Sequence, residues 1–117
     1  MPIPSGNGTE VLKSVSLKGN SNAWTTILNG VGDHIYTILS VVFVNTTNAA
    51  INIALQVDPT GNASNEIYLK HYSTDSLPAY SSYVWNDKFV MSGLDHLIVY
   101  SSTTCDMYVS YIDQDWT

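Results

Sequence analysis

The chain of 117 residues has room for one hydrophobic core, and a composition of 44% hydrophobic and 12% charged residues argues against disorder. Its polar side chains are mostly uncharged (14 Ser, 11 Thr and 10 Asn), and its many β-branched and aromatic residues favour an all-β fold over a helical bundle. The net charge is −6, arginine is absent and the four basic residues are the scattered Lys13, Lys18, Lys70 and Lys88, so binding to nucleic acid or to an anionic membrane is not expected.

Residues 1–22 are the least core-like part of the sequence. They contain three of the seven glycines and two of the four prolines, with one alternating segment at Val11–Leu17. We therefore expect an extended N-terminal arm followed by a weak or edge strand in residues 1–22, and a β-sandwich domain in residues 23–117. The arm, residues 1 to about 10, has little reason to order alone, so it either lies along a neighbouring subunit or a capsid lattice or is a terminus without a role.

Strand patterns recur after residue 23 at the spacing typical of a sandwich or a barrel. Segments rich in Gly, Pro, Asn and Asp separate them, and no window shows helical periodicity. The predicted fold is a single antiparallel β-sandwich of about eight strands. Its strands after the arm are Trp24–Leu28, His34–Val44, Ile51–Val57, Glu66–Tyr72, Tyr83–Val90, Leu97–Ser101 and Met107–Ile112.

The strand His34–Val44 differs from the others because it is apolar on both faces. Strict alternation places Ile35, Leu39, Val41 and Phe43 on one face and Tyr36, Ile38, Val42 and Val44 on the other. Ile51–Val57 and Met107–Tyr111 instead alternate between apolar and polar residues, as expected for a sheet with one wet face. The second apolar face must be covered either by another part of the chain or by a partner subunit, and we expect a symmetric homo-oligomer, a trimer or a dimer.

The stretch Ile35–Val57 is long enough to span a bilayer, but its centre carries Asn45-Thr46-Thr47-Asn48, which is typical of a hairpin turn. The N-terminus lacks the basic and apolar blocks of a signal peptide. These patterns predict a soluble protein. The one cysteine, Cys105, is expected to be a packed core residue, because it lies in a strand-like run and has no partner for an internal disulfide.

Motifs for catalysis and metal binding are weak. His34 and His96 each follow an aspartate, and the simplest interpretation is that the Asp ends a turn and the His begins a strand. His71 belongs to no ligand pattern, and Asp58–Asn62 is expected to be a plain turn because it lacks the acidic residues of a calcium loop. We therefore predict no enzyme, no catalytic residue, no metal and no cofactor. The three sequons, at Asn7, Asn45 and Asn62, are no more than chance expectation in this composition.

The surface composition points to recognition. Tyr, Trp, Ser and Asn provide rigid contact area together with adaptable hydrogen bonds. Tyr83 and Trp85 share one side of a strand, where they are either core aromatics or part of a docking face. One functional alternative is a carbohydrate-binding module in which Trp24, Trp85 and nearby tyrosines stack on sugar rings. Exposed aromatics around a shallow groove would favour that alternative.

The order of strands and turns resembles that of small structural proteins of tailed bacteriophage virions. The resemblance covers residues 33–113, and its loose hydrophobic and turn patterns are Tyr36–Asn48, Ile51–Val57, Ile67–His71, Leu77–Ala79, Asn86–Ser102 and Asp106–Asp113. Gly93-Leu94-Asp95 departs from the contiguous Gly-Asp of that pattern by one residue. No functional residue can be transferred by position.

The resemblance implies a β-sandwich that decorates or cements a capsid. The expected function is a non-enzymatic decoration or cement protein on the outer surface of the virion, with the major capsid protein as its partner. A neck, tail or head-fibre component of the virion is the alternative within the same class.

Overall fold

A computed structural model describes residues 8–59, 66–72 and 76–116 of the chain. The predicted arm lies for the most part outside these residues. Within them the secondary structure consists of nine strands and contains no α-helix. The strands are β1 (Thr9–Asn20), β2 (Ala23–Asn29), β3 (His34–Asn45), β4 (Ile53–Asp58), β5 (Ile67–Lys70), β6 (Ser82–Trp85), β7 (Phe89–Ser92), β8 (His96–Ser101) and β9 (Cys105–Asp115).

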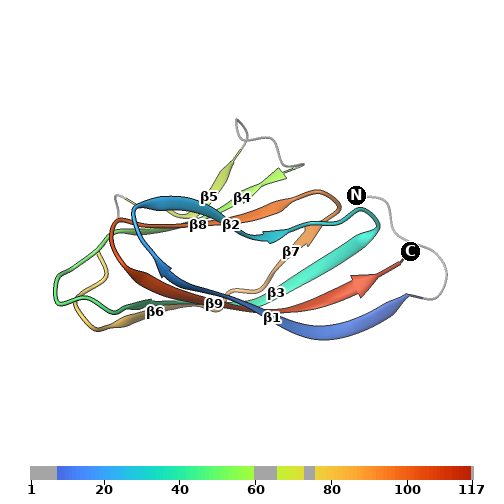
Figure 1. The fold of residues 1–117 in the computed structure, drawn as a ribbon. Helices are drawn as coiled ribbons and strands as arrows, with labels where there is room; N and C mark the ends of the chain where they lie inside the picture. Colours follow the sequence, from blue (N-terminus) through green and yellow to red (C-terminus); the bar gives the residue numbers. More distant parts are fainter. Residues whose placement is uncertain (1–7, 60–65, 73–75, 117) are drawn as a thin grey trace.

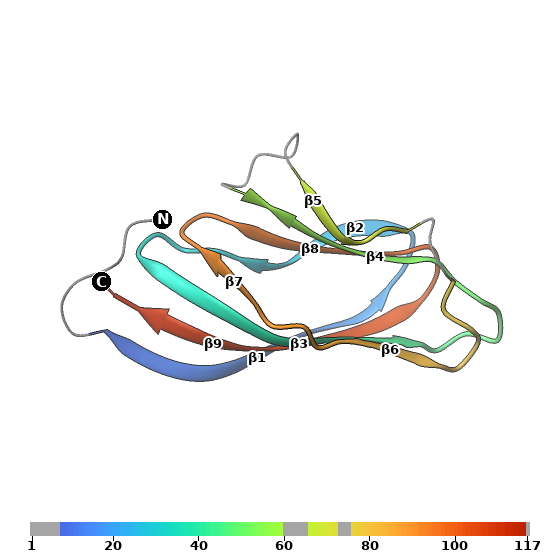
Figure 2. The same ribbon diagram turned by 180° about the vertical axis from the view of Figure 1, so that it is seen from behind.

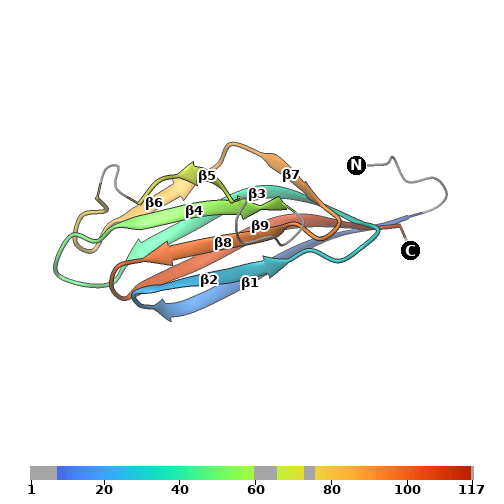
Figure 3. The same cartoon turned by 90° about the horizontal axis from the view of Figure 1, so that it is seen from above.

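The strands form two antiparallel sheets that pack face to face (Figures 1 and 2). Sheet A has the order β1-β9-β3-β6, with β7 also paired to β3, and sheet B has the order β2-β8-β4-β5. Viewed from above, the strands of the two sheets run in similar directions (Figure 3). Because β6 and β7 share one strand position, each sheet has four positions and the chain alternates between sheets in the order of a jelly roll. The predicted all-β sandwich is confirmed.

The first strand is longer than its sequence pattern predicted. The alternating segment Val11–Leu17 extends to Thr9–Asn20, and β1 lies at the edge of sheet A, where it pairs only with β9. Only one face of β1 contacts the core, through Val15 and Leu17, which explains why its pattern is weak.

The core lies between the sheets and is built by alternation. Met107, Val109 and Tyr111 of β9 face inward, as predicted, and so does the fully buried Cys105. Burial raises the pKa of the Cys105 thiol to about 11, so this cysteine is an inert packing residue. The apolar face predicted for the Ile51–Val57 strand also faces the core. Its other face, predicted to be wet, is not, because Ala54 and Gln56 are buried as well.

A β-bulge in β3 corrects the predicted faces of that strand. The register to β9 shifts between Ile38 and Ser40, so β3 has one extra residue there. As a result Tyr36 and Ile38 face the core before the bulge, and Val41 and Phe43 face it afterwards. Strict alternation had placed these two pairs on opposite faces, which is wrong. The prediction that β3 is apolar on both faces is confirmed, because the opposite side carries the residues Ile35, Leu39, Val42 and Val44.

The segment Tyr83–Val90, predicted as one strand, forms two. β6 and β7 both pair with β3, and Asn86–Lys88 between them is not strand. The interruption lies opposite the bulge of β3, so the two irregularities accommodate each other. Tyr83 and Trp85 face inward and pack against the core, and the indole Nε1 of Trp85 donates a hydrogen bond to the carbonyl of Asp87 (3.0 Å).

Candidate functional site

The three histidines lie in different places and form no common site. His34 begins β3 and His96 begins β8, as predicted, and each follows an aspartate at the end of a turn. His71 follows β5 and its ring contacts Tyr68 and Tyr72. Across the described residues, no group of three or more His, Cys, Asp or Glu side chains is arranged to hold a metal ion.

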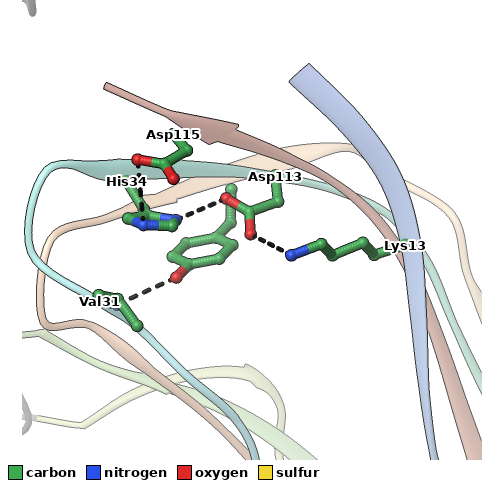
Figure 4. Close-up of polar contacts among 6 residues, drawn as sticks. Lys13, Val31, His34, Asp113 and Asp115 are labelled. Atoms are coloured by element: carbon green, nitrogen blue, oxygen red, sulfur yellow. Dashed lines mark hydrogen bonds and ion pairs between the residues drawn. The ribbon is translucent and has the colours of Figure 1, made fainter. Parts of the chain in front are cut away.

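A buried carboxylate, which the sequence motifs did not reveal, joins three strands at one end of sheet A (Figure 4). Lys13 of β1 donates a hydrogen bond from Nζ to Oδ2 of Asp113 in β9 (2.9 Å), and Nδ1 of His34 in β3 lies 2.8 Å from Oδ1 of the same carboxylate. Nε2 of His34 faces Oδ1 of Asp115 at 3.4 Å. The ring of His34 also stacks on that of Tyr36.

The electrostatics of this cluster favour a structural role. Burial acts most strongly on Asp113 and would raise its pKa, but the hydrogen bonds from Lys13 and His34 outweigh it and lower the pKa below the usual value. The same hydrogen bond raises the pKa of Lys13. Both ring nitrogens of His34 face carboxylates, so neither is directed at a substrate. The cluster ties β1, β3 and β9 together.

A signal for this cluster is present in the sequence. Lys13 lies in phase with Val11 and Val15, and Asp113 lies in phase with Val109 and Tyr111. The first series carries a positive charge and the second ends in carboxylates, and opposite charges on the same face of two neighbouring strands are typical of a cross-strand pair. The antiparallel register places Lys13 next to Tyr111, the inward neighbour of Asp113.

The outer face of sheet A is apolar and exposed. It carries Leu12 (70% exposed), Val90 (56%), Val84 (50%) and Tyr108 (47%). The register assembles Leu12, Ile112, Thr37 and Val90 into one cross-strand row and Ser16, Tyr108, Val42 and Val84 into another. A row of three serines, Ser14, Ser110 and Ser40, separates these two rows. Charged side chains lie beyond them, Glu10 at one end of the face and Lys18 and Asp106 near Val44 at the other. No described segment lies across this face (Figures 1 and 2).

The outer face of sheet B carries an aromatic cluster instead. Trp24 of β2 stacks on Tyr100 of β8 with ring centroids 4.6 Å apart, and Tyr68 and Tyr72 approach Trp24 edge-on at 6.2 and 6.0 Å. A groove of about 560 Å³ lies beside these rings. We call it the aromatic groove; its lining residues are Trp24, Gln56, Glu66, Tyr68, Tyr72, Ile98 and Tyr100.

The two tryptophans proposed from the sequence for sugar stacking do not meet. Trp24 lies on the outer face of sheet B, whereas Trp85 is half-buried against the core from sheet A. The prediction that they act together is therefore wrong, because their strands belong to different sheets. The tyrosines that surround Trp24 come from β5, β8 and the segment after β5, which sequence spacing alone does not bring together.

The remaining sequence motifs are structural or lie outside the described residues. Asp58 ends β4 and is buried, whereas Asn62 of the predicted turn is not described. Of the three sequons, those at Asn7 and Asn62 also lie outside the described residues. The side chain of Asn45 is buried and hydrogen-bonded, so it is not an accessible acceptor for a glycan in the folded chain. Within the described part, no helix has the length and hydropathy required to cross a membrane.

No protein-family model and no curated protein matches the chain. Similarity is found among solved structures. A chain in the structure of infectious bursal disease virus, Gx strain, superposes with a TM-score of 0.56 at 10% identity over 96% of this chain. The present chain spans only about a third of that protein, 34% of its length.

A subunit of Bacillus endospore appendages, described as a novel family of disulfide-linked pili, superposes with a TM-score of 0.52 at 14% identity. Here the match covers 100% of this chain and 97% of the other. A pentameric capsid protein isolated from metagenomic phage sequences gives a TM-score of 0.44, which is too low to carry an argument. At these identities the comparisons establish a shared jelly-roll-like fold.

Proposed function

We propose that this chain is a non-enzymatic structural protein of a bacteriophage virion, a decoration or cement protein that binds the major capsid protein lattice on its outer surface. The observation that carries the proposal is the apolar outer face of sheet A. Five of its apolar side chains are more than a third exposed, and gathered exposed apolar side chains of this kind often mark an interaction surface. Burial of these side chains against another surface removes apolar area from water, which favours binding.

The fold and the charge support this role. The jelly roll is shared with a chain of a virus structure, and the order of strands and turns over residues 33–113 resembles that of small phage virion proteins. A net charge of −6 suits an outer surface away from packaged DNA. In this mechanism many copies act together, so a modest interface per copy gives durable attachment. A symmetric homo-oligomer, a trimer or a dimer, is compatible with this attachment if the contact between copies buries one part of the face and the capsid covers the rest.

Assembly through disulfide-linked pili is a poorer fit. The only cysteine of the sequence, Cys105, is fully buried on the inward face of β9. A thiol in that position cannot reach a neighbouring subunit unless the core opens. Assembly through the outer face of sheet A requires no such change.

Quantitative mass spectrometry of purified virions tests the proposal. A decoration protein is present at hundreds of copies per particle, whereas a neck, tail or head-fibre component is present at about a dozen because of the symmetry of those parts. Absence from purified particles would reject a virion role. The count thus separates the proposed function from its closest alternative.

Reattachment to capsids that lack the protein tests the surface itself. Val90→Glu places a charge at the β7 end of an apolar row on the outer face of sheet A, and Leu94→Glu is the matched control at similar exposure (56% and 59%) outside that face. We expect Val90→Glu to abolish attachment and Leu94→Glu to retain it. Equal attachment of both variants would show that another surface docks.

A further inference from the structure

The aromatic groove on the outer face of sheet B has no role in the proposed attachment through sheet A. Its rings are unusually exposed for their size: Trp24 is 46%, Tyr72 40% and Tyr68 39% exposed. Isolated exposed aromatics are ordinary, but four contiguous rings beside a groove are typical of a recognition surface. Tyr and Trp present large rigid faces at a low cost in conformational entropy.

A buried amide at this groove is the second observation. Gln56 of β4 lines the groove, and the residue is only 4% exposed. Its side-chain amide has two N–H donors and one acceptor oxygen, which give the wall of the groove hydrogen-bonding groups for a polar ligand. Glu66, at the exposed end of the same groove, adds two acceptor oxygens.

The charge of the lining restricts the class of ligand. No Lys or Arg is among the lining residues, and the only charged side chain there is Glu66. A phosphate, a nucleic acid or an acidic polymer would therefore find no counterion in the groove. The ligand must be uncharged, with apolar faces for the rings and hydroxyl groups for Gln56 and Glu66.

The packing of the rings distinguishes a platform from a cage. A quaternary ammonium is held by ring faces arranged around an empty centre. Here Trp24 and Tyr100 stack on each other at 4.6 Å, and Tyr68 and Tyr72 approach Trp24 edge-on, so the rings fill the space between them. They support a flat ligand beside the cluster and enclose no cation.

We propose that the aromatic groove is a binding site for neutral glycans. One hexopyranose ring lies with its C–H face on the aromatic cluster around Trp24, and its hydroxyl groups exchange hydrogen bonds with the amide of Gln56 and the carboxylate of Glu66. Because this groove is on sheet B and the apolar face is on sheet A, the site does not depend on the proposed function. A glycan can bind while the other sheet is attached.

A screen of neutral hexose oligosaccharides, followed by calorimetry with the best one, tests the site. Trp24→Ala removes the platform and is expected to weaken binding by at least about tenfold. Tyr108→Ala is the matched control, because Tyr108 is equally exposed (47%) on the opposite sheet, and it should bind as the wild type does. Both variants alter exposed rings, so their folding can be verified by unchanged thermal unfolding.

Gln56→Leu provides the sharper test, because it separates binding from stability. Leucine keeps the bulk of the side chain but removes its donors and its acceptor, so thermal unfolding should be nearly unchanged while glycan binding is lost. The proposal is overturned if no neutral oligosaccharide binds at millimolar concentration, if Trp24→Ala and Gln56→Leu bind normally, or if choline binds and the sugars do not.

Discussion

Asn45 shows how one side chain can fix two loops. Its amide nitrogen donates to the carbonyls of Ala49 (2.8 Å), Leu77 (3.2 Å) and Pro78 (3.0 Å), and its amide oxygen accepts hydrogen bonds from the backbone N–H and the hydroxyl of Thr47. Asn45 is only 1% exposed, so water cannot replace these partners at its amide. The residue therefore joins the end of β3 to the turn after it and to the segment that precedes β6.

We expect Asn45→Asp to destabilise the protein by roughly 2–4 kcal/mol, although the two side chains have the same shape. A carboxylate cannot donate, so three carbonyls lose the hydrogen bond from residue 45 and face a negative charge instead. Asn48→Asp, at an exposed position of the same turn, should change stability by no more than about 0.5 kcal/mol. Chemical denaturation of the three proteins measures both values. Equal stability of Asn45→Asp and the wild type would contradict the role of the amide.

Asp113 makes stability depend on pH in the acid range. Its pKa is lower in the folded chain than in the unfolded chain, so its contribution is fully present above the unfolded value, near 3.8, and is lost as the pH falls through the folded value. Lys13, His34, Tyr36, Tyr111 and Asp115 are the titratable groups around it.

Asp113→Asn should therefore be less stable than the wild type at pH 7, by about 1–3 kcal/mol, because an amide replaces a buried, hydrogen-bonded carboxylate. The difference should shrink as the pH falls below about 4, because the carboxylate of the unfolded chain is protonated first and that of the folded chain only at a lower pH. Urea unfolding of both proteins from pH 7 to pH 2 measures the gap. A gap that stays constant over that range would show that the charge of Asp113 contributes nothing.

At the scale of the element, β3 shows what alternation predicts and where it fails. The length of this strand and its two apolar faces follow from its sequence, because nearly every residue from Ile35 to Val44 is apolar. The bulge after Ile38 does not, since an extra residue leaves no mark in a run that is apolar on both sides. The break between β6 and β7 was missed for the same reason, because it lies opposite the bulge of β3 and depends on that bulge. The aromatic groove depends on pairings between β2, β8, β4 and β5, which no local pattern contains.

The bulge gives opposite roles to two residues that strict alternation makes equivalent. Val41 is fully buried in the core, whereas Leu39 lies on the outer face of sheet A. Val41→Ala should cost about 2–3 kcal/mol through the cavity it leaves, and Leu39→Ala less than about 1 kcal/mol, despite the larger side chain. Thermal or denaturant unfolding compares the two. Equal losses would mean that the faces of β3 are as alternation predicts.

For the whole molecule, the jelly roll presents two outer faces of different chemistry on opposite sides of one core. Sheet A presents aliphatic side chains in cross-strand rows, which suits a protein surface, and sheet B presents stacked rings beside a buried amide, which suits a small polar ligand. The same core residues hold both sheets, so each face is rigid without support from the other. This arrangement implies that each of the two proposed functions, attachment through sheet A and glycan binding at sheet B, can be abolished by substitution without loss of the other.

Self-association measured by light scattering after gel filtration tests this separation. We expect the wild type to be a trimer or a dimer, and the double variant Val84→Glu, Val90→Glu to be a monomer, because two charges in the outer face of sheet A cannot be buried unpaired. That monomer should still bind the glycan selected with the wild type, because its aromatic groove is unchanged. Trp24→Ala should show the reverse, an intact oligomer without glycan binding. A wild-type protein that stays monomeric at tens of micromolar would exclude self-association through sheet A, and loss of glycan binding by the double variant would show that the two faces are not independent.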